Sequence, residues 1–100
     1  MKFGISGDTL SIIISTLREF AEIKKASVFG SRALGNYKNG SDIDLVVFGP
    51  EVTTEIINLL SIKLNEELSL PYYFDVIHYE TLDSKELKEH VDTFAKGFYP

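Results

Sequence analysis

The segment IDLVVFG, residues 43–49, constrains the fold more than any other part of this chain. It is an almost continuous apolar run, which is typical of a strand buried on both faces of a sheet. Two further segments are rich in strand-forming residues, ASVFG at 26–30 and YYFDVIHY at 72–79. These runs predict a layered fold in which helices cover a sheet.

Segments with helical periodicity are predicted at three places, residues 8–22, 50–68 and 83–97. Asp8 is expected to cap the first helix. Asp83 or Ser84 should cap the last, which is expected to end at Gly97. Residues 31–35 are predicted to form a helical turn before a loop rich in turn-forming residues.

The predicted order of elements is therefore α-β-(turn)-β-α-β-α. This order corresponds to an α/β (α+β) fold, with helices packed against a small mixed sheet of three or four strands. One hundred residues suit a single domain spanning residues 1–100. No apolar run approaches the roughly 18 residues of a membrane span, and the first residues, MKFGISGD, make a poor signal peptide.

The charge balance bears on the kind of partner. Fifteen Asp and Glu outnumber ten Lys and Arg, giving a formal net charge of −5, whereas proteins that grip nucleic acid usually show a basic face. A long nucleic-acid partner is therefore not expected, but a small anionic ligand held through a metal ion is compatible with this charge. The chain has no cysteine, which fits a reducing compartment, and we expect a cytoplasmic protein.

Three aspartates stand beside or within the predicted strands. Asp42 and Asp44 share one face, with Cα atoms about 6.6 Å apart, while Ile43 and Leu45 point into the core. Asp75 interrupts the apolar segment at 72–79. If the two strands are neighbours, the three carboxylates converge, and such a set of hard oxygen ligands suits Mg²⁺ together with substrate phosphates.

Structural roles are the alternative for each of these residues. Asp42 could simply end a turn, Asp44 could pair with Arg32 or Lys38, and Asp75 could cap an edge strand. The two histidines are expected to have no catalytic role. His78 is predicted to pack or lie at the surface, and His90 to face solvent or an interface.

The Gly30-Ser31-Arg32 segment follows the first predicted strand. Glycine lets the backbone approach a ligand closely, and the amides that open a helical turn can donate to phosphate. The Ser31 hydroxyl adds a donor, and Arg32 could neutralise phosphate charge. Eleven residues separate Ser31 from Asp42, a step that can bring the loop back beside the carboxylates.

The stretch GSRALGNYKNGSDIDL, residues 30–45, resembles the signature of the polymerase β-like nucleotidyltransferase superfamily, in which Gly-Ser precedes Asp-x-Asp. The segment LPYYFDVIHY, residues 70–79, is similar to the later strand that carries its third aspartate. The small size further resembles the minimal nucleotidyltransferase (MNT) domains of this superfamily. The matching stretches cover about half of the chain, and the order of elements nearly all of it.

The resemblance implies a role for each matched residue. Gly30 and Ser31 would hold the β- and γ-phosphates of ATP or another nucleoside triphosphate. Asp42 and Asp44 would bind two Mg²⁺ ions. Asp75 would bind the metal that activates the acceptor hydroxyl and help to remove its proton. The reaction would be an in-line attack on the α-phosphate that releases pyrophosphate.

The resemblance also suggests a partner. Minimal nucleotidyltransferases are commonly encoded beside a helical HEPN protein, often an RNase toxin. In some pairs the MNT protein is an antitoxin that adds AMP to a tyrosine of the toxin. An acceptor surface would come from such a partner or from a second copy of the chain. Two alternatives stay open: a catalytically silent module that neutralises its partner by contact, and a transferase that acts on a small molecule.

Overall fold

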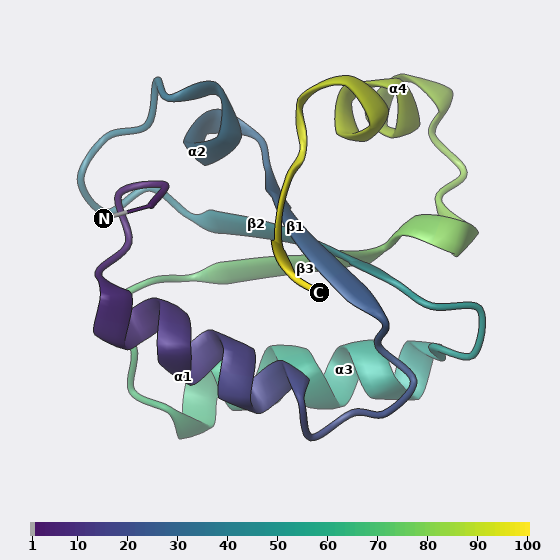
Figure 1. Cartoon of the computed structure of the whole chain (residues 1–100), viewed down its shortest axis with the longest axis horizontal. Helices are drawn as coiled ribbons and strands as arrows, with labels where there is room; N and C mark the ends of the chain where they lie inside the picture. The colour runs from purple at the N-terminus through teal and green to yellow at the C-terminus, as the bar shows by residue number, and fades with distance from the viewer. Residues whose placement is uncertain (1) are drawn as a thin grey trace.

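The computed structural model describes residues 2–100, which form a four-stranded mixed sheet with helices on both faces (Figure 1). The helices are α1 (Gly7–Leu17), α2 (Ser31–Leu34), α3 (Thr54–Ile62) and α4 (Lys85–Phe94). The strands are β1 (Lys25–Phe29), β2 (Ile43–Phe48), β3 (Phe74–His78) and β4 (Lys96–Tyr99). A π-helical turn, Lys63–Glu67, extends α3, and a short 3₁₀ turn, Tyr79–Thr81, follows β3. The predicted α/β architecture is confirmed.

Strand β2 lies inside the sheet, whose strand order is β3-β2-β1-β4. It pairs antiparallel with β1 and parallel with β3. Four of its six residues have no exposed surface: Ile43, Leu45, Val46 and Val47. The prediction of a strand buried on both faces is therefore confirmed.

The two faces of the sheet bury different sets of side chains. Helices α1 and α3 cover one face, and α2 and α4 lie over the other (Figure 1). The larger core includes Ile13 and Leu17 of α1, Leu60 of α3 and Leu45 of β2. A smaller cluster beneath α4 joins Phe29, Val46 and Val91. Because strand residues alternate, Leu45 points to the α1 and α3 face and Asp44 to the α4 face.

The end of the chain corrects one prediction, because the last helix does not continue to Gly97. It ends at Phe94, and Ala95 already has an extended backbone, with φ −62° and ψ 140°. Residues Lys96–Tyr99 instead form β4, which pairs antiparallel with the otherwise free edge of β1. Hydrogen bonding to β1, together with packing of Phe98 and Tyr99 against the core, overrides the helical period.

Helices α1 and α3 are also shorter than predicted. Helix α1 ends at Leu17, and its cap is Ser6 rather than Asp8, because the Ser6 hydroxyl accepts a hydrogen bond from the Thr9 amide at 3.2 Å. Helix α3 begins after Thr53, whose hydroxyl accepts from the Ile56 amide at 3.2 Å, and not at Pro50. Of the two predicted caps for α4, Ser84 is the observed one.

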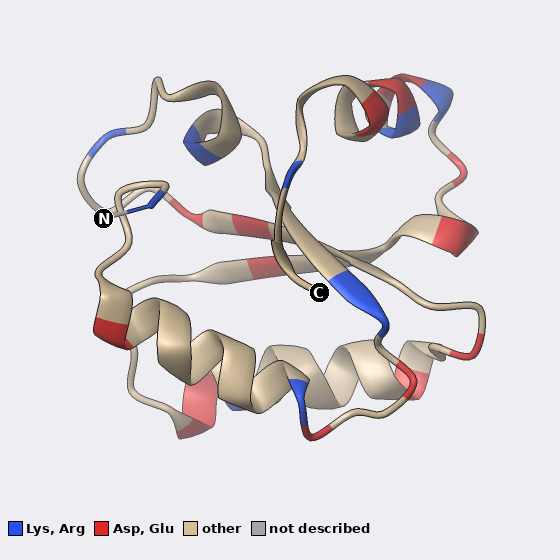
Figure 2. Cartoon of the chain, viewed as in Figure 1, with Lys and Arg blue, Asp and Glu red and all other residues tan. Residues whose placement is uncertain are grey.

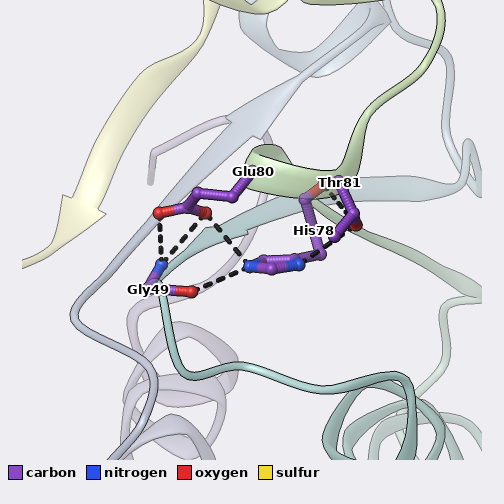
Figure 3. A network of polar contacts seen from close by, with 4 residues as sticks. All are labelled: Gly49, His78, Glu80 and Thr81. Atoms are coloured by element: carbon purple, nitrogen blue, oxygen red, sulfur yellow. Dashed lines mark hydrogen bonds and ion pairs between the residues drawn. The ribbon is translucent and has the colours of Figure 1, made fainter.

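A partly buried polar network joins the ends of β2 and β3 (Figure 3). The His78 Nε2 lies 2.8 Å from the carbonyl oxygen of Gly49, and its Nδ1 lies 3.1 Å from the Thr81 hydroxyl. The Glu80 carboxylate accepts from the Gly49 amide at 3.0 and 3.2 Å. His78 therefore has the packing role that the sequence suggested, and it ties the two strands together.

Within residues 2–100, none of the helices combines the length and the hydropathy that a membrane-spanning helix requires.

Leu45→Ala is expected to lower the free energy of unfolding by about 2–5 kcal/mol, because it leaves a cavity under a side chain with no exposed surface. Leu59→Ala is the matched control. Leu59 is 48% exposed on α3, so its truncation should cost about 0.5 kcal/mol or less. Urea unfolding of both variants measures the difference, and equal losses would contradict the burial of β2.

Candidate functional site

The parallel pairing of β2 and β3 places two aspartates directly opposite each other. Asp44 of β2 is the Cα partner of Asp75 of β3, and the acidic segments of these strands lie side by side (Figure 2). Asp44 is half-buried, whereas Asp75 and Asp42 are exposed. The condition set by the sequence, that the two strands are neighbours, is therefore met, and it brings Asp44 and Asp75 together.

The environment of Asp44 disfavours its negative charge. Burial raises the pKa of Asp44 above its ordinary value of 3.8, and the nearby charges of Asp75 and Asp42 raise this pKa further. The charge of Arg32, and that of His90 whenever its ring is protonated, lower this pKa and so oppose the effect. Among residues 2–100, Asp44 forms no ion pair with Arg32 or Lys38, the structural role that the sequence left open. A carboxylate held in this way gains from a bound cation.

Gly30 brings the end of β1 against Asp44. Its backbone has φ 71° and ψ −151°, a region that is open almost only to glycine. A Cβ atom at this position would overlap the Oδ2 of Asp44. Phe29, the preceding residue, is the Cα partner of Asp44 across the β1–β2 ladder. The loop that begins with Gly30 and Ser31 therefore lies on the same side of the sheet as the carboxylates.

His90 of α4 reaches the same loop. Its Nε2 accepts a hydrogen bond from the Gly30 amide at 3.1 Å. The ring packs edge-on against Phe29, with centroids 6.2 Å apart, and lies 5.3 Å from the Phe94 ring. The expectation that His90 faces solvent is therefore wrong, because these contacts fix it beside Gly30 and half-bury it, while an interface stays a prediction. No motif identified it, since 60 residues separate His90 from Gly30.

The donor groups of Arg32 are used inside the protein, although the sequence suggested this residue as a phosphate ligand. It is only 3% exposed, and each of its three side-chain nitrogens donates to a backbone carbonyl oxygen. The acceptors are the carbonyl groups of Phe3, Ser41 and Asp42. The guanidinium also lies over the rings of Tyr37 and Tyr72, at 5.0 and 5.1 Å. Arg32 thus holds the loop that precedes Asp42.

Asn65 positions the strand that carries Asp75. Its side-chain carbonyl accepts from the Phe74 amide at 2.7 Å, and its side-chain amide donates to the Phe74 carbonyl at 3.0 Å. These two bonds fix the start of β3 one residue before Asp75. Sequence analysis missed this role, because Asn65 lies in the π-helical turn and nothing in its neighbours relates it to a strand.

The donor set fits a magnesium ion that binds together with a phosphate-bearing ligand. Within the described residues 2–100, no three His, Asp or Glu side chains are gathered closely enough to hold a metal ion unaided. Mg²⁺ commonly takes one or two carboxylates and completes its shell with water and substrate phosphates. Asp44 with Asp42 or Asp75 supplies such carboxylates, and the repulsion at Asp44 gives the cation a favourable place.

A separate open cavity of about 500 Å³ lies beside α2. Lys2, Lys96, Tyr37 and Arg32 are among the residues that line it. Its lining, as far as the described residues show, includes none of the three aspartates. The two lysines make this cavity the alternative place for an anionic ligand, but it lacks the carboxylates that phosphoryl chemistry with a metal needs.

The chain belongs to the polymerase beta nucleotidyltransferase family, because the nucleotidyltransferase domain model of that family matches residues 12–98. The family resemblance of the sequence is therefore confirmed, and the chain carries a nucleotidyltransferase domain. Among curated proteins, none matches the chain.

Solved structures of toxin–antitoxin complexes share the fold. A toxin–antitoxin with AMP-PNP is 25% identical, with a TM-score of 0.73 over 90% of this chain and 73% of that chain. The MntA–HepT toxin–antitoxin is 21% identical, with a TM-score of 0.70 over 95% of this chain and 74% of that chain. A tri-AMPylated HEPN toxin in complex with MNT antitoxin, from Shewanella oneidensis, is 22% identical, with a TM-score of 0.66 over 90% and 69% of the two chains.

Asp44→Asn is expected to raise the melting temperature at neutral pH, because the amide removes a charge that burial and the neighbouring aspartates disfavour. The raised pKa of Asp44 means that its ionisation destabilises the folded state as the pH rises above 3.8. The gain in the variant should therefore be full at neutral pH and shrink as the pH falls toward 3.8. Thermal melts across this range measure it.

Glu51→Gln is the control for this measurement, since it removes one negative charge from an exposed residue on the turn before α3. The melting temperature of Glu51→Gln should stay close to that of wild type at every pH. A lower melting temperature for Asp44→Asn at neutral pH would show that Asp44 stabilises the fold, and would contradict its assignment to the site.

Proposed function

We propose that this chain is a Mg²⁺-dependent nucleotidyltransferase that moves AMP from ATP to a hydroxyl group of a partner protein. We further propose that it forms a single minimal domain and acts in the cytoplasm as the antitoxin of a HEPN-type toxin. The observation that carries the proposal is the placement of Asp44 opposite Asp75 with Gly30 packed against it. The nucleotide-bound and AMPylated toxin–antitoxin complexes with the same fold support the choice of ATP and of a protein acceptor.

Gly30 and Ser31 are proposed to bind the β- and γ-phosphates. Gly30 offers a backbone amide beside Asp44, where only a residue without a Cβ fits, and Ser31 adds a hydroxyl donor. Asp42 and Asp44 would hold the metal ions, which when bound supply positive charge to the phosphate oxygens. Arg32 contributes by holding the carbonyl groups of Ser41 and Asp42, so that the residues before Asp44 keep their place.

Asp75 is proposed to face the acceptor hydroxyl, since it is the exposed member of the opposed pair. The acceptor oxygen forms a bond to the α-phosphorus, and the bond from that phosphorus to the bridging oxygen of the β-phosphate breaks. Pyrophosphate leaves with the bond's electron pair, and the hydroxyl proton passes to the Asp75 carboxylate. Positioning and charge neutralisation account for most of the rate in such reactions.

A contact-only antitoxin with the same fold is the competing function. It would need no charge at Asp44, and the disfavoured ionisation there would then bring only a loss of stability. Active sites commonly contain ionisable groups whose pKa is shifted by their surroundings, because catalysis uses such groups. The clustered aspartates therefore favour the enzyme.

The test is transfer of label from ATP carrying a radioactive α-phosphate, with Mg²⁺, in lysate of the source cell. Wild type should label a protease-sensitive band. Asp44→Asn should lose at least about 100-fold of this activity, the size typical of removing a group that stabilises transition-state charge. Glu51→Gln should keep it.

Other outcomes would contradict the proposal in distinct ways. A nuclease-sensitive labelled band would assign the acceptor to RNA rather than protein. A partner that copurifies with the chain but takes no label from any of the four nucleotides would show neutralisation by contact alone. Equal labelling by wild type and Asp44→Asn would remove Asp44 from the reaction.

A further inference from the structure

The Gly30 amide already has a hydrogen-bond acceptor within the chain. The Nε2 of His90 accepts from it at 3.1 Å, across a contact that joins α4 to the loop after β1. A ring nitrogen that accepts from a backbone N–H carries no proton itself. The imidazole in this contact is therefore an acceptor, like a phosphate oxygen.

One N–H cannot make a full hydrogen bond to two acceptors at once. The proposed function assigns the Gly30 amide to a phosphate of the nucleotide, and the His90 ring nitrogen occupies the same donor direction. A Cβ at Gly30 would overlap Asp44, so this amide belongs to the wall of the site that carries the carboxylates. The imidazole and the phosphate therefore compete for one donor.

The ring is held in place by more than this hydrogen bond. Phe29 contacts it edge-on and Phe94 lies against it at a tilt of 46°. Its backbone lies in the last turns of α4, whose Val91 is buried against the sheet. The imidazole is thus held beside the Gly30 amide by ring contacts as well as by the hydrogen bond.

We propose that His90 is a nucleotide-site residue that competes with the triphosphate for the Gly30 amide and thereby sets nucleotide affinity. This inference rests on the proposed function, because it needs a phosphate at Gly30. The nucleotide displaces the imidazole, and the free energy of the lost Gly30–His90 hydrogen bond is subtracted from the free energy of binding. His90 is thus a residue that weakens substrate binding.

The test compares His90→Leu, which fills the space between the phenylalanine rings without an acceptor, with His90→Gln, whose side-chain oxygen can still accept. Calorimetry with Mg²⁺ and AMP-PNP gives the dissociation constants. His90→Leu should bind about two- to ten-fold more tightly than wild type, the range expected for one net hydrogen bond. His90→Gln should stay within about two-fold of wild type.

Hydrogen exchange of the Gly30 amide is the second readout. The amide should exchange faster in His90→Leu than in wild type, and at close to the wild-type rate in His90→Gln, because only the glutamine restores an acceptor. A purely structural role for His90 would instead weaken nucleotide binding in both variants. His90→Ala replaces His90→Leu if the leucine variant does not melt cooperatively, with the same expected direction.

The outcomes separate this inference from the proposed function. If wild type binds AMP-PNP and His90→Leu binds it no more tightly than His90→Gln, the competition is wrong and the nucleotide site stands. If His90→Leu binds AMP-PNP and wild type does not, the competition is stronger than expected and both ideas are supported. If none of the three proteins binds a nucleotide, both are wrong.

Discussion

The parallel ladder between β2 and β3 is the interaction on which the site depends, because it sets Asp44 opposite Asp75. Like charges that lie directly across a ladder destabilise it. The same ladder buries Leu45 and Val46, and each such side chain contributes about 1.5–3 kcal/mol on burial. The apolar strand thus outweighs the repulsion it creates. One residue of slippage would move Asp44 to the other face and break the site.

Polar contacts fix this register at both ends. Asn65 pairs with the backbone of Phe74 immediately before Asp75. At the other end, His78 bonds to the Gly49 carbonyl and Glu80 accepts from the Gly49 amide (Figure 3). The site is therefore assembled on rigid elements. Buried hydrogen-bonded groups of this kind define one geometry at a small net gain in stability.

The sequence predicted the parts of this structure that depend on local pattern. The run at 43–49 identified the central strand, and alternation within it placed Ile43 and Leu45 in the core and Asp44 on the other face. The Gly-Ser and Asp-x-Asp spacing identified the family, as the match over residues 12–98 confirms. The prediction that Asp75 lies near Asp44 required their two strands to be neighbours in the sheet. No local sequence pattern determines which strands are neighbours.

Features that depend on distant partners were missed. Lys96 and Gly97 were assigned to the end of the last helix, yet they belong to a strand that pairs with the open edge of β1. His90 and Asn65 look like ordinary helix residues until the chain brings Gly30 and Phe74 beside them. Arg32 was expected to face phosphate because of its charge, but three backbone carbonyl groups lie within its reach. Each of these features depends on a tertiary contact between distant residues, which a single sequence does not reveal.

Nucleotide is proposed to bind between the Gly30 loop and the opposed aspartates Asp44 and Asp75. The most direct measurement is the change in backbone amide NMR shifts when Mg²⁺ and AMP-PNP are titrated into the wild-type protein. The largest changes are expected at Gly30, Ser31, Asp44 and Asp75. Changes confined to the cavity lined by Lys2, Tyr37 and Lys96, with the aspartate strands unaffected, would contradict it.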